Sequence, residues 1–196
     1  MSRLPRDFFA RDTLAVAREL LGQRLVRLLN GQRLAGRIVE VEAYVGEGDG
    51  ACHASRGRTK RNAPMFGPPG HAYVYFIYGM HHCFNVVTER AGYPAAVLIR
   101  ALEPLEGIEL MRELRGGRPD LPLTSGPARL CQALGIDRRL DGADLCAPDA
   151  LLFLERAAAV LDEAVVTGPR IGVRGDEAAL ISPWRFYIRD NEYVSR

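Results

Sequence analysis

Residues 37 to 45 read RIVEVEAYV, an alternation of apolar and polar side chains that is typical of a β-strand. Side chains on a strand repeat every second residue, so Glu40, Glu42 and Tyr44 are expected to share one face with Ile38. Two carboxylates beside an aromatic ring are costly inside a protein unless they are paired, hydrogen-bonded or used in chemistry. The same pattern also fits an edge strand with a wet polar face. The segment alone leaves both readings open.

The glutamate strand is expected to be the second arm of a β-hairpin. Residues 24–29 form a strand-like run before it, and the strand itself starts at Gln32. Between them stands Asn30-Gly31, a pair that favours the two-residue turn whose twist matches that of the strands. The glutamates are therefore predicted to lie on a paired strand.

A second hairpin is predicted farther along the chain, with Tyr78, Gly79 and Met80 at its tip. It follows a long loop, residues 46–72, and a loop of this length in a compact domain usually has a function. Other strands are expected at 97–102, 151–154 and 185–188, and helices from Asp12 to Leu21, from Pro104 through Leu114 and from Ser125 to Gly135. The sequence thus predicts one α+β domain over residues 1–196: a curved, mostly antiparallel β-sheet, surrounding helices and a protruding β-hairpin.

Composition and cysteine usage point to an ordinary globular protein of the cytoplasm. The chain has 196 residues, 47% hydrophobic and 26% charged, with no run near the roughly 20 apolar residues that cross a bilayer. We expect no secretory leader. We expect reduced thiols and no membrane contact. A zinc site is the alternative, but Cys52-His53 and His81-His82 are adjacent pairs that point to opposite faces of an extended chain, so no metal is expected.

Positive charge is concentrated in the long loop. The net charge is only +2, yet no acidic residue occurs between Asp49 and Glu89. The basic residues of that stretch are Arg56, Arg58, Lys60 and Arg61. With aromatic residues and glycines around them, they indicate either a surface that contacts a polyanion or simply a solvated loop.

Several motifs, in order along nearly the whole chain, closely resemble the alkyladenine (3-methyladenine) DNA glycosylases. They are RIVEVEAY at 37–44, YVYFIYGM at 73–80, LIRALEPLEG at 98–107, TSGP at 124–127 with LCQAL at 130–134, GPRIGV at 168–173 and RFY at 185–187. The resemblance implies a DNA repair enzyme that flips a damaged purine out of double-stranded DNA and cuts its N-glycosidic bond. It implies no cofactor and, if the protein is bacterial, association with the nucleoid. We expect a monomer.

The resemblance also implies roles for residues of the catalytic centre. Glu42 is similar to the glutamate that activates the attacking water, and Tyr44, His53 and Tyr75 resemble the walls of the base pocket. Glu40 is not the catalytic position, and its expected role is structural.

The wedge that fills the gap in the duplex is expected at Tyr78, with Met80 beside it. The other implied positions are Asn85, which obstructs the 2-amino group of guanine, Arg100, which lines the site near the backbone, and DNA-phosphate contacts at Arg56, Arg58, Lys60, Arg61, Ser125 and Gly126.

Most of these residues have a structural reading as well, which the sequence leaves open. On these readings Tyr78 is a hairpin aromatic that packs on its own sheet, Tyr75 is a core tyrosine and His53 is a structural histidine. Asn85 caps a turn, and Arg100 forms an ion pair with Glu103 or Glu40. Ser125 is the N-cap of a helix.

The chemistry agrees with the resemblance. N-alkylated adenine is cationic and is attracted to electron-rich ring faces, and a carboxylate both deprotonates water and stabilises an oxocarbenium-like sugar. Glycosylases that also nick the strand need an amine, and Lys60 is the only lysine. We therefore expect a monofunctional enzyme that acts on 3-methyladenine, with hypoxanthine and ethenoadenine as further candidates. The rival readings are a non-catalytic nucleic-acid-binding module and a metal-dependent hydrolase.

Overall fold

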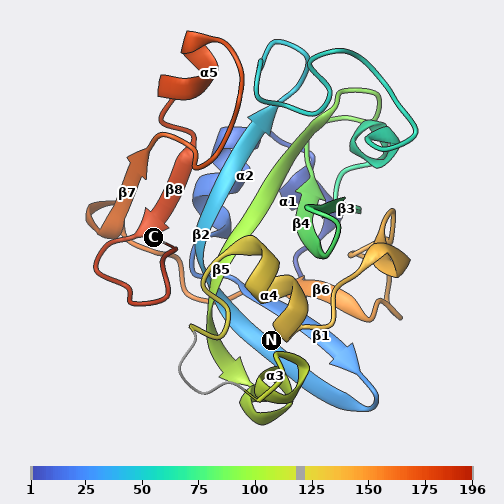
Figure 1. Cartoon of the computed structure of the whole chain (residues 1–196), viewed down its shortest axis with the longest axis vertical. Helices are drawn as coiled ribbons and strands as arrows, with labels where there is room; N and C mark the ends of the chain where they lie inside the picture. Colours follow the sequence, from blue (N-terminus) through green and yellow to red (C-terminus); the bar gives the residue numbers. More distant parts are fainter. Residues whose placement is uncertain (1, 118–121, 196) are drawn as a thin grey trace.

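The computed structural model describes residues 2–117 and 122–195. Its strands are β1 (Arg24–Leu29), β2 (Gln32–Val45), β3 (Ala72–Ile77), β4 (His81–Val87), β5 (Ala95–Glu106), β6 (Leu152–Glu155), β7 (Val165–Gly168) and β8 (Arg185–Ile188). They form one sheet in the order β3-β4-β5-β2-β1-β6, and β8 pairs with both β2 and β7 (Figure 1). These neighbours run antiparallel. The curved antiparallel sheet predicted from the sequence is confirmed.

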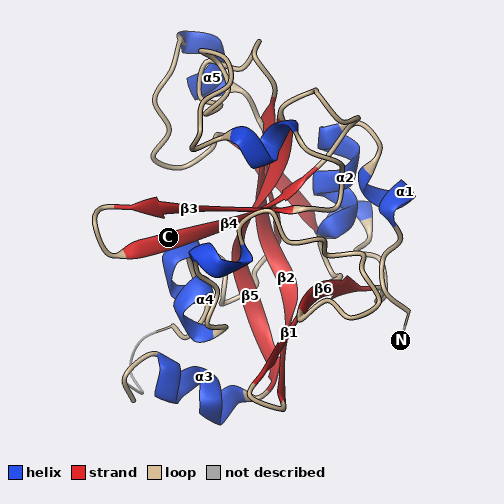
Figure 2. Ribbon diagram, turned by 90° about the vertical axis from the view of Figure 1, so that its right-hand side faces the viewer, coloured by secondary structure: helices blue, strands red, loops and turns tan. Residues whose placement is uncertain are grey.

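Short helices cover both faces of this sheet. They are α1 (Arg6–Phe9), α2 (Thr13–Leu20), α3 (Ile108–Leu114), α4 (Pro127–Ala133) and α5 (Glu177–Ile181), with 3-10 turns η1 (Ala63–Phe66), η2 (Arg138–Leu140) and η3 (Asp162–Ala164). Figure 2 shows α1 and α2 on one side of the sheet, α3 and α4 on the other, and the β3–β4 hairpin projecting from it. The α+β class and the protruding hairpin are therefore also confirmed. Among the residues described, none of the helices combines the length and hydropathy needed to cross a bilayer.

The glutamate strand β2 lies in the middle of the sheet, because β5 pairs along one side and β1 and β8 pair along the other. The edge-strand reading is therefore wrong. Val39, Val41 and Ala43 pack in the main core as the alternation predicts. Ile38 packs in that core too, although it was predicted on the glutamate face. The pairing with β5 shifts register on both sides of Glu40, and a bulge of this kind turns neighbouring side chains to the same face.

The local turn and helix signals were mostly correct. The Asp12 side chain caps α2, and Gly22, with φ +84°, follows the end of that helix. The predicted helix start at Pro104 is wrong, because Pro104 lies inside β5 and α3 begins only after Gly107. Pro104 pairs with Gly36 beside a register shift, a place where the missing N–H of a proline is tolerated within a sheet.

The long loop after β2 is packed against the sheet. Its residues Cys52, Ala54 and Met65 form a second apolar cluster with Tyr73 of β3 and neighbours on β4 and β5. Tyr44, Phe66 and Tyr75 pack against this cluster while remaining partly accessible. The four cysteines are free thiols, as predicted, with Cys52, Cys83 and Cys131 buried. The loop therefore has a fixed shape and forms one side of a cavity.

Candidate active site

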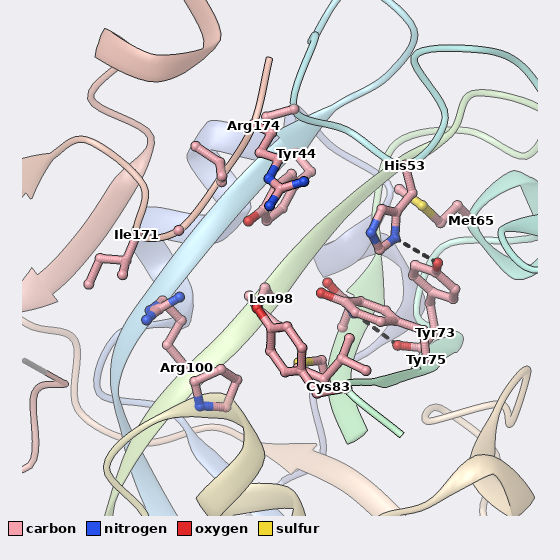
Figure 3. A pocket seen from close by; sticks show the side chains of 17 residues that line it. Tyr44, His53, Met65, Tyr73, Tyr75, Cys83, Leu98, Arg100, Ile171 and Arg174 are labelled. Atoms are coloured by element: carbon pink, nitrogen blue, oxygen red, sulfur yellow. Dashed lines mark hydrogen bonds between the residues drawn. The ribbon is translucent and has the colours of Figure 1, made fainter. Parts of the chain in front are cut away.

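A cavity of about 470 Å³ opens between the β3–β4 hairpin, the loop after β2 and the segment 171–174 after β7 (Figure 3). This volume is in the usual range for sites that bind small molecules. Of the residues predicted for the catalytic centre and base pocket, five line it: Tyr44, His53, Tyr75, Asn85 and Arg100. The fold thus brings together positions spread over almost 60 residues of sequence.

Glu42 lies directly behind the cavity wall and is fully buried. Its Oε2 accepts a hydrogen bond from the Tyr44 hydroxyl at 2.9 Å. Its Oε1 accepts the backbone N–H of Ile171 at 2.7 Å and is 3.1 Å from Arg100 Nη1. All three donors belong to residues that line the cavity. A carboxylate offers about four acceptor positions, so these contacts hold Glu42 in place and leave one lone-pair direction unused by them.

Glu40, two residues earlier, is equally buried but has other partners. Its Oε1 accepts from Arg100 Nε at 3.0 Å and Arg185 Nε at 2.7 Å, and its Oε2 accepts from the backbone N–H of Ser195 at 2.7 Å. The reading that Arg100 pairs with Glu40 is confirmed, whereas Glu103 contacts Asn191 instead.

Arg100 of β5 bridges the two carboxylates from a nearly buried position, with 7% of its surface exposed. Burial by itself disfavours the cation. The charges of Glu42 and Glu40 outweigh that effect and raise the pKa of the guanidinium. Arg100 therefore remains charged beside Glu42.

The aromatic wall of the cavity is built from the long loop and β3. The His53 ring meets Tyr75 edge-on with centroids 4.5 Å apart, and His53 Nδ1 is 2.9 Å from the Tyr73 hydroxyl. His53 keeps an exposed side, yet burial of its ring, with a smaller contribution from Arg61, lowers its pKa to about 4. Burial also raises the pKa values of Tyr44 and Tyr75 far above the usual range. The wall consequently presents neutral rings at neutral pH.

Asn85 of β4 is buried and lines the cavity. Its amide Nδ2 donates to the backbone carbonyl of Tyr73 on the neighbouring strand at 3.0 Å. It sits within a strand, so the reading of Asn85 as a turn cap is wrong. This hydrogen bond fixes the orientation of the amide at the cavity wall.

A buried ion pair holds the opposite side of the cavity, and sequence reasoning assigned it no role. Arg170 contacts both oxygens of Asp49, at 2.5 and 2.7 Å, with both side chains fully buried. Its guanidinium lies 4.8 Å from the Tyr44 ring centroid and 4.9 Å from that of Trp184. This anchor sets the position of the next residue, Ile171, whose N–H reaches Glu42. Arg170 belongs to the quoted GPRIGV motif, but among 25 arginines its type alone does not mark it as buried.

The tip of the β3–β4 hairpin exposes apolar side chains. Tyr78 is 88% exposed, and Met80 and Phe76 are also exposed. Tyr78 has φ 51°, a left-handed conformation that is unusual for a bulky side chain, and Gly79 follows with φ 70°. The Tyr78 side chain also reaches the rim of the cavity. The reading of Tyr78 as an aromatic packed on its own sheet is wrong.

The basic residues of the loop are exposed, as a phosphate-contacting surface requires: Arg56, Arg58, Lys60 and Arg61. The Arg61 guanidinium lies 5.4 Å from the Tyr75 ring centroid, which places this surface next to the cavity. At α4 the N-cap is Gly126, without a side-chain cap, so the reading of Ser125 as N-cap is wrong. Ser125 is buried and bridges to the backbone of Ala101. In the described ranges no group of three or more His, Cys, Asp or Glu side chains is arranged to hold a metal ion.

An aromatic cavity above a buried carboxylate, beside an exposed aromatic at a hairpin tip, is the arrangement expected of an enzyme that acts on a base outside the DNA stack. Residues 7–192 match the family model described as methylpurine-DNA glycosylase (MPG). The chain belongs to the methylpurine-DNA glycosylase family and is a DNA glycosylase. The resemblance inferred from the motifs is confirmed.

Curated relatives are similar to this chain over almost their whole lengths. A protein of Methanocella arvoryzae is 56% identical over 100% of this chain and 97% of its own. One from Carboxydothermus hydrogenoformans is 53% identical over 98% of each chain, and one from Myxococcus xanthus is 51% identical over 100% and 95%. Each carries the name "Putative 3-methyladenine DNA glycosylase".

Proposed function

We propose that this glycosylase excises 3-methyladenine from double-stranded DNA by hydrolysing the N-glycosidic bond with a water that Glu42 activates. It leaves an abasic site and works as a monomer without a cofactor. The observation that carries the proposal is the fully buried Glu42 carboxylate, held by donors from three residues that line the cavity. The names of the relatives support the choice of lesion.

Binding begins with extrusion of the damaged nucleotide, which costs a few kcal/mol of stacking and pairing. Tyr78 fills the space that the nucleotide leaves, since the ring is exposed at the hairpin tip beside the cavity. The basic loop residues 56–61 and the backbone at Ser125 and Gly126 contact phosphates on either side. These contacts supply affinity without reading the sequence.

The cavity selects the lesion by charge and shape. Tyr44 and Tyr75 stay protonated and present neutral ring faces, to which a cationic alkylated purine binds by up to about 2 kcal/mol when desolvated. Asn85 obstructs the 2-amino group of guanine, because its amide is held by Tyr73. Undamaged guanine is thereby excluded.

Cleavage builds positive charge on the sugar as the purine leaves. Glu42 stabilises this charge and accepts a proton from the attacking water, two roles that one fixed anion serves. A cationic purine needs no added proton to leave. Hypoxanthine and ethenoadenine are neutral, so their excision requires a proton at the leaving base and is expected to be slower.

The proposal is tested with Glu42→Gln, which keeps the shape of the side chain and removes its charge. Duplexes that carry one 3-methyladenine or hypoxanthine are incubated with excess enzyme, and base release is measured by alkaline cleavage. The rate is expected to fall roughly 10²- to 10⁴-fold, while affinity for a duplex with a tetrahydrofuran abasic-site analogue is retained. The exposed Glu47→Gln is the matched control and keeps full activity.

Full base release by Glu42→Gln would show that Glu42 is not the catalytic group. Absence of release by the wild-type protein from any lesion duplex would favour the non-catalytic binding module. Loss of activity in excess chelator would favour a metal-dependent hydrolase. Trapping of a covalent protein–DNA adduct by borohydride would contradict the hydrolytic, monofunctional mechanism, in which Lys60 has no part.

A further inference from the structure

The proposed chemistry does not use the buried carboxylate of Glu40. It has no exposed surface and lies on β2 two residues before Glu42. A buried anion is costly unless it is fully compensated, and an apolar side chain would fill the same position at less cost. Its partners indicate what it does.

Arg100 is held by contacts to all three of its side-chain nitrogens. Its Nε donates to Glu40 Oε1 at 3.0 Å, its Nη1 lies 3.1 Å from Glu42 Oε1, and its Nη2 donates to Ser195 Oγ at 3.2 Å. A planar guanidinium bound along all its edges cannot rotate. The face that Arg100 presents to Glu42 is therefore fixed by Glu40 and Ser195.

Ser195 in turn is tied to Glu40 by two hydrogen bonds. Its N–H donates to Glu40 Oε2 at 2.7 Å and its hydroxyl donates to Oε1 at 2.9 Å. The backbone carbonyl of Ser195 accepts from Arg185 Nη2 at 3.2 Å. Segment 191–195 is thus anchored to the charged cluster, and the contact joins residues 155 positions apart.

Charge balance gives Glu40 a second task. Arg185 pairs in register with Glu42 across β8 and β2, but its Nε is bound by Glu40. The two carboxylates and the two arginines sum to zero. Without Glu40, the only carboxylate left beside the two arginines would be Glu42. Their positive charge would then weaken the negative potential with which Glu42 stabilises the sugar cation and deprotonates the water.

We propose that Glu40 and Ser195 are positioning residues that fix Arg100 against Glu42 and neutralise the excess positive charge around it. This inference rests on the proposed catalytic role of Glu42. Glu40 and Ser195 themselves act through Arg100 and do not touch the substrate.

The test compares Glu40→Gln, Ser195→Ala and Ser195→Thr in single-turnover base release from a hypoxanthine duplex. Glu40→Gln is expected to slow release by roughly 10- to 100-fold, because Arg100 loses its fixed orientation. Ser195→Ala slows it by roughly 3- to 10-fold, the equivalent of one hydrogen bond, and Ser195→Thr, which keeps the hydroxyl, restores the rate. Affinity for the abasic-analogue duplex stays at the wild-type level in all three. Glu47→Gln again serves as the control.

The binding control and the Ser195 pair separate positioning from a general structural defect. A protein that is merely destabilised would bind the abasic-analogue duplex more weakly, and Ser195→Thr would be no better than Ser195→Ala. Positioning lowers the rate alone, and the variant that keeps the hydroxyl restores it.

An unchanged rate in Glu40→Gln, or a lower rate that comes with weaker binding of the abasic-analogue duplex, would overturn the inference. So would a loss of rate in Ser195→Ala that Ser195→Thr fails to restore. Thermal unfolding shows whether Glu40→Gln folds. If it does not, the comparison of Ser195→Ala with Ser195→Thr tests the inference without it. Retained activity of Glu42→Gln is a distinct result that refutes the proposed function and not the geometry of this cluster.

Discussion

Two hairpins of the molecule turn with nearly the same backbone geometry but use different residues to do so. In β1–β2 the turn is Asn30 at φ 51° and Gly31 at φ 76°, and in β3–β4 it is Tyr78 at φ 51° and Gly79 at φ 70°. Asparagine is one of the few residues that tolerate this left-handed conformation, whereas a bulky tyrosine is an outlier there. The residues of the first turn suit this conformation, whereas the second turn holds a bulky side chain in it at a cost in strain.

The side chains exposed around the two turns also differ in kind. The β1–β2 turn exposes Asn30, Gly31 and Gln32, which are polar or small. The β3–β4 tip exposes Phe76, Tyr78 and Met80 and projects from the sheet (Figure 2). Exposed apolar groups gathered at one place mark a contact surface, and strained residues cluster at functional sites. The comparison therefore supports the proposal that Tyr78 contacts the DNA.

The largest expected effect comes from Tyr78→Ala. Without the ring, the gap left by the extruded nucleotide is not filled, and base release from a duplex is expected to fall roughly 10- to 100-fold, the equivalent of a few kcal/mol of lost compensation. Release from a single-stranded oligonucleotide, which has no such gap, should change much less. Single-turnover assays on the two substrates measure this ratio. Equal losses on both would show that Tyr78 serves the pocket and not the duplex, and Asn30→Ala should affect neither.

The glycines of the two turns provide the next test. A Cβ added at Gly31 or Gly79 meets nothing within 4 Å, so alanine there introduces only backbone strain. Each substitution is expected to lower the free energy of unfolding by about 1–2 kcal/mol in urea denaturation. Only Gly79→Ala should also lower base release from duplex DNA. Gly48→Ala, equally unobstructed and without a positive φ, is the matched control. Loss of activity in Gly31→Ala would contradict the division between the two hairpins.

The two hairpins also show how far the sequence could predict the fold. Asn-Gly encodes its turn locally, and the pairing period of two placed Glu40 and Glu42 on a common face correctly. The failures at Ile38 and Pro104 both lie beside register shifts between β2 and β5. Such shifts depend on how two distant strands fit together, and neither strand alone carries a signal for them.

The candidate site, too, could be predicted from the sequence only in part. Most residues of the pocket lie in motifs that could be read along the chain, but its supports are long-range. Arg170 meets Asp49 across 121 residues, and Ser195 meets Glu40 across 155. Burial decides which arginines matter, and a sequence with 25 arginines does not disclose it. Single-sequence reasoning therefore named residues that line the cavity, and of the contacts behind it anticipated the pair of Arg100 with Glu40 but not the roles of Arg170 and Ser195.

A smaller effect is expected when a tyrosine is placed in the other turn. Asn30→Tyr places a bulky side chain in the left-handed conformation without any partner to compensate. The free energy of unfolding should fall by about 1 kcal/mol, with base release unchanged. Denaturant titration and the duplex assay measure the two quantities. If stability is unchanged, tyrosine at φ near 51° carries no cost in this turn type, and Tyr78 cannot be called strained.

The smallest effect, and the one of opposite sign, is expected for Tyr78→Asn. The side chain is 88% exposed and contributes little packing, so its replacement by a residue suited to the turn should raise the free energy of unfolding by about 0.5–1 kcal/mol. Duplex activity should fall as in Tyr78→Ala. A gain in stability with a loss in activity at one surface residue is hard to explain by packing, because damage to packing lowers both. If Tyr78→Asn is instead less stable than the wild type, the ring makes contacts that stabilise the hairpin, and its left-handed conformation is not maintained for DNA.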